Sequence, residues 1–176
     1  MNDYWSHLLA TLGAPFTQTD AMPSILLVSA WFALLRYFRY SGYGIALLAV
    51  VGTSLHEAAH FVVGFLLRAE PVSVNLFPKR SATGWTLGSV GFTGLNIFNS
   101  AFVAFAPLLL LVISWTVFTW WLVPAFVAGQ YLSWCIAGYV AACALFSSIP
   151  SGTDVRLGAV SAVMYIAVGW LLCHYV

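Results

Sequence analysis

Residues 52–61 read GTSLHEAAHF and lie near the middle of an apolar run that extends from about residue 44 to residue 68. A run of this length and hydrophobicity predicts a helix that crosses a membrane. Side chains four residues apart share one face of a helix, so the imidazoles of His56 and His60 can reach the same ion. Glu57 can touch a water molecule beside that ion. The segment therefore predicts a metal site within a transmembrane helix.

The composition of the whole chain also indicates a membrane protein. Of the 176 residues, 62% are hydrophobic and 6% are charged, whereas an ordinary soluble domain has about 25% charged residues. Four further apolar runs predict helices at 23–40, 98–122, 125–147 and 156–175. We therefore expect an all-α polytopic membrane protein with about five transmembrane helices, embedded in a lipid bilayer as a multi-pass protein.

The domain organisation follows from the same pattern. Residues 1–22 predict a polar or interfacial N-terminal segment, and residues 23–176 predict a single transmembrane domain. The net charge is +1 and the longest basic run is Lys79-Arg80, so the sequence indicates no nucleic-acid partner.

Residues 69–94 depart from the helical pattern. Val72, Val74 and Leu76 alternate with more polar neighbours, and glycine and threonine are frequent in the second half. Alternation with a period of two predicts a β-hairpin after the second helix. Open sheet edges are not tolerated against lipid, so we expect the hairpin at the membrane interface or in a cavity lined by protein.

Two histidines and a glutamate near the bilayer centre require a reason. A charge there costs at least about 2.5 kcal/mol on insertion scales, and it is seldom kept without a partner or a function. Such residues can also act as polar groups that hydrogen-bond neighbouring helices. Metal-ligand spacing with an adjacent acid favours the metal site.

The third ligand has to come from elsewhere in the chain, because a catalytic zinc usually takes three protein ligands and leaves a fourth position for water. Asp154 follows a break with Pro150 and Gly152 between two apolar runs. Such a break allows a polar cavity among the helices, so Asp154 is the best candidate. The alternative is that Thr153 or Asp154 only caps the last helix.

These features together resemble the site-2 protease family of intramembrane zinc metalloproteases. The resemblance covers about residues 44–170 and consists of HExxH in a transmembrane helix, a following hairpin segment and a later proline-containing break that ends in aspartate. It implies that the chain is a minimal, divergent member whose residues 23–176 form a metalloprotease-like domain. Val155 stands where the family commonly has glycine.

The resemblance also implies roles for individual residues. His56, His60 and Asp154 would be ligands of Zn²⁺, and Glu57 would be the catalytic general base. The family's third helix carries a Gly-Pro followed by asparagine, whereas here leucines follow Ala106-Pro107. Asn96 and Asn99, just upstream, are the nearest polar substitutes and become candidates for substrate binding, with helix capping as the alternative.

The predicted function is hydrolysis of peptide bonds in membrane-embedded or membrane-proximal protein substrates by a zinc-dependent endopeptidase. The alternative is a catalytically inactive zinc-binding membrane protein that acts as a client escort, a scaffold or a metal carrier. An inactive protein would keep the zinc ligands but would not need Glu57 as a base.

Overall fold

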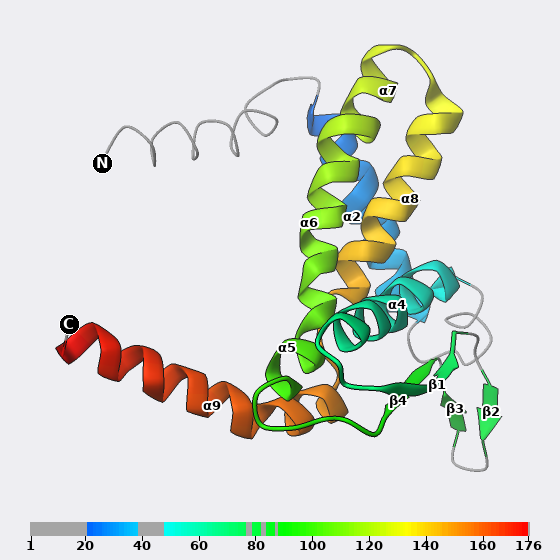
Figure 1. The fold of residues 1–176 in the computed structure, drawn as a ribbon. Coiled ribbons are helices and arrows are strands. Elements are labelled where there is room, and N and C mark those ends of the chain that lie inside the picture. The colour runs from blue at the N-terminus through cyan, green and yellow to red at the C-terminus, as the bar shows by residue number, and fades with distance from the viewer. Residues whose placement is uncertain (1–20, 39–47, 77–78, 82–83, 87, 176) are drawn as a thin grey trace.

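A computed structural model describes residues 21–38, 48–76, 79–81, 84–86 and 88–175 of the chain (Figure 1). The helices are α2 (Ala21–Phe38), α4 (Val50–Leu66), α5 (Ser100–Ala104), α6 (Leu109–Val117), α7 (Val123–Val127), α8 (Tyr131–Ser147) and α9 (Gly152–Tyr175). A 3-10 turn, η1 (Ala106–Leu108), precedes α6, and a π-helical turn, η2 (Phe118–Leu122), joins α6 to α7. The strands are β1 (Pro71–Asn75), β2 (Lys79–Ser81), β3 (Gly84–Thr86) and β4 (Ser89–Phe92). The predicted N-terminal segment falls almost entirely outside the described residues.

Among the described residues, three helical segments are long and apolar enough to cross a membrane, namely α2, the run Ala106–Val127 and α9. The other two predicted spans correspond to α4 and α8, which have 17 residues each. A helix of that length extends about 26 Å, a little less than the roughly 30 Å of a hydrocarbon core. The mostly helical fold is confirmed, whereas the count of five spans stays a prediction.

The predicted break between the third and fourth helices is misplaced by several residues. The helical path continues through Pro124, which lies directly after the π-helical turn η2. The chain reverses instead at Gly129, whose φ is +69°. Its amide donates to Phe126 O, and the amide of Gln130 donates to Ala125 O, both at 2.9 Å. This pattern ends a helix with a left-handed glycine.

The predicted hairpin is confirmed. β1 pairs with β4 in an antiparallel register that places Ser73 opposite Gly91 and Val74 opposite Val90. β2 pairs with β3 further out along the same hairpin. The β1–β4 ribbon lies beside α4 (Figure 1), so it forms one wall of the region that surrounds the HExxH motif.

Helix α8 is the centre of the helical bundle and packs against α2, α4 and α6. Its buried residues are all small: Ala137, Gly138, Ala141, Ala142, Cys143 and Ala144. Small residues let helix backbones approach closely, and polar groups then bond between helices. Ser114 Oγ donates to Ala141 O at 2.9 Å, and Tyr139 Oη donates to Leu48 O at 2.7 Å. These contacts fix α8 in the bundle and thereby determine where its C-terminal end meets α4.

Helix α9 is held near its first turns by α5 and then projects away from the bundle (Figure 1). Gly158 packs against Ala104, and the fully buried Ser161 accepts a hydrogen bond from the amide of Ala101 at 3.2 Å. These contacts place the N-terminal end of α9 beside α4 and α5.

Two glycines of α9 provide a matched test of this packing. A Cβ added at Gly158 would lie 2.6 Å from the Cβ of Ala104, whereas a Cβ added at Gly169 would meet nothing within 4 Å. Both Gly→Ala changes raise helix propensity by about 1 kcal/mol, but overpacking typically costs about 1–3 kcal/mol. We expect Gly158→Ala to melt at a lower temperature than Gly169→Ala in detergent, measured by circular dichroism. Equal melting temperatures would contradict the α5–α9 contact.

Candidate metal centre

One face of α4 carries the centre and its supports. Gly52, His56, His60 and Gly64 recur every four residues and therefore lie along one side of the helix. A Cβ at Gly52 would overlap the end of α8, and a Cβ at Gly64 would overlap β4. The two glycines thus allow α8 and β4 to approach α4 on either side of the histidines.

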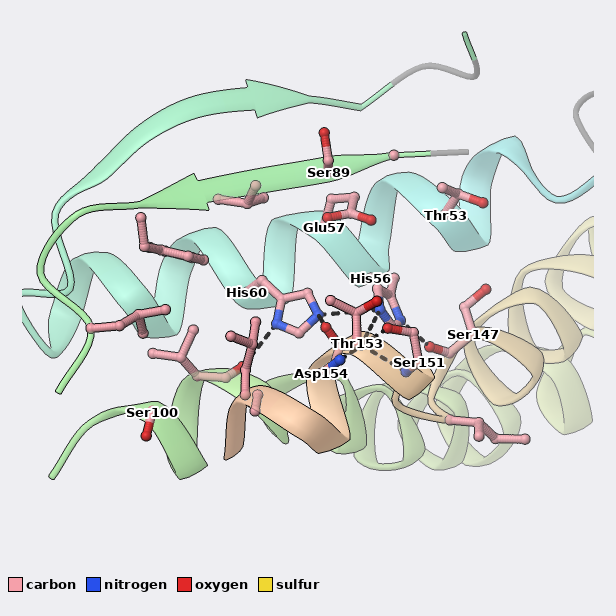
Figure 2. Close-up of a pocket in the computed structure, with 18 of the residues that line it drawn as sticks. Thr53, His56, Glu57, His60, Ser89, Ser100, Ser147, Ser151, Thr153 and Asp154 are labelled. Atoms are coloured by element: carbon pink, nitrogen blue, oxygen red, sulfur yellow. Dashed lines mark hydrogen bonds and ion pairs between the residues drawn. The ribbon is translucent and has the colours of Figure 1, made fainter. Parts of the chain in front are cut away.

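His56, His60 and Asp154 converge in space (Figure 2). The Nε2 atoms of the two histidines are 3.2 Å apart. Asp154 Oδ2 lies 3.5 Å from His56 Nε2, and Asp154 Oδ1 lies 3.4 Å from His60 Nε2. Tetrahedral zinc with bonds of about 2.0–2.1 Å separates its ligand atoms by about 3.3 Å. The closest approaches between the three residues are near this value, and the two to Asp154 end on different carboxylate oxygens. One ligand atom from each residue lies within 4.8 Å of the others, close enough for one ion to contact all three residues.

The other ring nitrogens determine the tautomers. His56 Nδ1 lies 2.7 Å from Ser147 O, and His60 Nδ1 lies 2.8 Å from Val103 O. A carbonyl oxygen only accepts hydrogen bonds, so each Nδ1 carries the proton and donates it. In the neutral imidazoles, the lone pairs on Nε2 then point toward Asp154 and toward each other. Three electron-pair donors that converge in this way favour a cation between them.

The end of α8 contributes to the same arrangement. Ser147 is the last residue of α8, where backbone carbonyls have no partner within the helix. Its carbonyl is therefore free to accept the proton of His56. The partial negative charge at a helix C-terminus also favours a cation nearby.

Asp154 is oriented by the start of α9. The amide of Ser151 donates to Asp154 Oδ2 at 2.7 Å, and the amide of Asp154 donates to Ser151 Oγ at 3.2 Å. This reciprocal pair is a capping box, with Ser151 as the cap and Asp154 three residues on. The capping residue is therefore Ser151, and the expectation that Thr153 or Asp154 is the cap is wrong. Asp154 belongs to the cap and also faces the two histidines.

Glu57 lies in the same cavity but on a different side of α4. The cavity has a volume of about 540 Å³ and is lined by His56, Glu57, His60 and Asp154. Figure 2 shows Glu57 toward β4, whereas both histidines lie toward the start of α9. Glu57 is 9% exposed. Hydroxyl groups line much of the remaining polar surface: Thr53, Ser89, Ser100, Ser147, Ser151 and Thr153.

The two asparagines predicted to bind substrate are not part of this cavity. The lining includes neither Asn96 nor Asn99. Asn96 Oδ1 accepts from the amide of Phe98 at 2.8 Å, and Asn99 Oδ1 accepts from the amide of Asn96 at 2.8 Å. Asn99 Nδ2 donates to Gly94 O at 3.0 Å. Both side chains shape the turn before α5, and neither forms a side-chain capping hydrogen bond to that helix.

The groups that orient the ligands were not predicted from the sequence. Ser151 had a readable signal, because a serine three residues before an acid is the spacing of a capping box. The carbonyls of Ser147 and Val103 had none, since every residue has a carbonyl and only packing selects these two.

No protein-family model, curated protein or solved structure matches the chain. Functional assignment therefore depends on the HExxH motif and on the geometry of the residues around it.

Replacing the cap tests how Asp154 is held. Ser151→Ala removes the hydroxyl that accepts the amide of Asp154, so the carboxylate loses part of its orientation. Loss of such a supporting group typically weakens metal binding by about 10- to 100-fold. We expect this loss for Zn²⁺ titrated against a chelating dye, with helix content unchanged.

Ser151→Thr is the matched control, because threonine keeps the capping hydroxyl. It should bind Zn²⁺ as the wild type does. Wild-type affinity in Ser151→Ala would show that the capping box does not orient Asp154.

Proposed function

We propose that this protein is a multi-pass intramembrane zinc metalloprotease, similar to the site-2 protease family, that hydrolyses peptide bonds of membrane-embedded or membrane-proximal substrates. The observation that carries this proposal is the convergence of His56, His60 and Asp154, with separations of 3.2–3.5 Å, in one cavity with Glu57. The three apolar helices of spanning length support the membrane location.

The donor set suits zinc. Two neutral imidazoles and one carboxylate are a ligand combination found in zinc peptidases, and they leave a position for water. His56, His60 and Asp154 would hold the ion. When bound, zinc lowers the pKa of a coordinated water and polarises a carbonyl group.

Glu57 would supply the proton transfers. Hydrolysis joins the oxygen of water to the carbonyl carbon and breaks the C–N bond, which leaves a carboxylic acid and an amine. Glu57 would accept a proton from the attacking water and pass it to the departing nitrogen. Its place in the same cavity as the ligand set, next to His56 in the chain, supports this role.

The hairpin offers a way to hold the substrate. A helical substrate hides its carbonyls in its own hydrogen bonds, so it has to unwind before attack. Ser89, Val90 and Phe92 of β4 line the cavity, and an extended segment can pair with a strand edge. We propose that the hairpin holds the unwound substrate beside Glu57.

Substitutions in the HExxH motif test the enzyme against its alternatives. Glu57→Gln keeps the shape of the side chain but cannot accept a proton, so it should retain zinc and lose cleavage of a transmembrane peptide. Loss of a general base costs about 100- to 10,000-fold in rate. His56→Ala and Asp154→Ala should lose zinc as well, measured by metal analysis of the same purified samples.

The outcomes separate the candidate functions. Zinc bound without any cleavage by the wild type would indicate an inactive client escort, a scaffold that uses zinc or a metal carrier. Equal cleavage by Glu57→Gln would contradict the role of Glu57. A wild-type protein without zinc, indifferent to added divalent cations, would contradict the metal centre itself.

The need for unwinding predicts a dependence on the substrate. In a matched series of transmembrane peptides, glycine or proline near the cleavage position should increase the cleavage rate, because these residues destabilise a helix by about 1 and 3 kcal/mol. The rates can be followed by mass spectrometry in detergent. Equal rates across the series would contradict unwinding as a condition for cleavage.

A further inference from the structure

The strand β4 is preceded by a glycine that lies directly against Glu57. A Cβ added at Gly88 would lie 2.5 Å from Glu57 Cγ and 2.8 Å from Glu57 Oε1. Such short distances do not occur between a real Cβ and its neighbours, because non-bonded carbon atoms are in optimal contact at about 3.5–4.0 Å and repel one another when closer. Any residue other than glycine at position 88 would therefore displace the side chain of Glu57 or the strand.

Glycine is required at position 88 because there is no room for a side chain, and not because of its backbone conformation. The φ of Gly88 lies outside the left-handed region, in contrast to Gly129 with φ +69°. Its backbone is thus open to other residues, and a conformational need for glycine is absent. The close approach to Glu57 is the remaining reason for glycine.

Packing is also what holds Glu57. Within the described part of the chain, no hydrogen bond to the Glu57 carboxylate is formed, whereas both histidines donate to backbone carbonyls. With 9% of its surface exposed, the Glu57 side chain points from α4 toward β4 (Figure 2) and lies directly beside Gly88. Its location therefore depends on the shape of that contact.

We propose that Gly88 is a positioning residue for Glu57: its missing side chain lets the hairpin close over α4 and sets where the carboxylate lies in the cavity. This inference rests on the proposed function for its catalytic consequence. The contact itself is independent of catalysis. The three atoms nearest to a Cβ at position 88 all belong to Glu57, so Gly88→Ala should leave metal binding unchanged.

A double-mutant cycle tests the contact without any assay of activity. The four proteins are the wild type, Gly88→Ala, Glu57→Ala and the double variant, melted in chelator so that metal plays no part. Gly88→Ala should lower the melting temperature when Glu57 is present. It should have a smaller effect when residue 57 is alanine, because alanine lacks the side-chain atoms that the new Cβ would overlap. Equal effects of Gly88→Ala in the two backgrounds would overturn the proposal. Gly169→Ala controls for the general effect of replacing glycine, since its Cβ meets nothing within 4 Å.

Kinetics then test the positioning role. Gly88→Ala should retain zinc and lose about 10- to 100-fold in kcat, with a smaller change in KM, because a misplaced group costs rate more than binding. Glu57→Asp, which is shorter by one methylene, should already be slow, and Gly88→Ala should slow it little further. Wild-type kcat in Gly88→Ala would overturn the positioning role and leave the proposed function intact.

Failure of the proposed function can be distinguished from failure of the Gly88 proposal. If the zinc-loaded wild type cleaves no peptide, the protease proposal fails, and the melting cycle still decides whether Gly88 sets the place of Glu57. The two proposals are therefore separable by the same set of variants.

Discussion

Two hydrogen bonds from histidine to backbone carbonyls are the constraint on which the site depends. They hold the protons on Nδ1 of His56 and His60, so both Nε2 lone pairs face the carboxylate of Asp154. Without a cation, three electron-pair donors at these distances would repel one another, and the repulsion is stronger in a surrounding of low dielectric constant. The arrangement is thus a place where positive charge is favoured, and the surrounding fold serves to maintain it.

The carbonyls and the carboxylate are brought to α4 by three separate packing contacts. Gly52 lets α8 end against α4, which presents the carbonyl of Ser147. The α5 segment presents Val103 and also receives α9 through Gly158 and Ser161. Each contact uses small or hydroxyl side chains, which permit close approach of helices that have little hydrophobic driving force between them in lipid. A larger side chain at any of these positions would move a ligand or its support.

The proposed metal-binding histidines and the proposed base point in different directions from α4. The histidines point toward α9 and Glu57 points toward β4 (Figure 2), where Gly88 lies beside it. Glu57 and the histidines occupy neighbouring parts of the α4 surface, so one helix can serve both ion binding and proton transfer. The single cavity that reaches both groups is what joins the two roles.

The sequence by itself determined the features that depend on local geometry. The spacing of His56 and His60 puts them on one face of any helix, and the alternation after residue 71 predicts a hairpin. Only the tertiary structure decided that the end of α8 and the first turn of α9 come to His56 and His60, and that Asn96 and Asn99 stay outside the cavity. Helix and strand periodicity act over a few residues and are visible in any segment. The approach of segments some 90 residues apart depends on which surfaces pack, and one sequence pattern is compatible with many such packings.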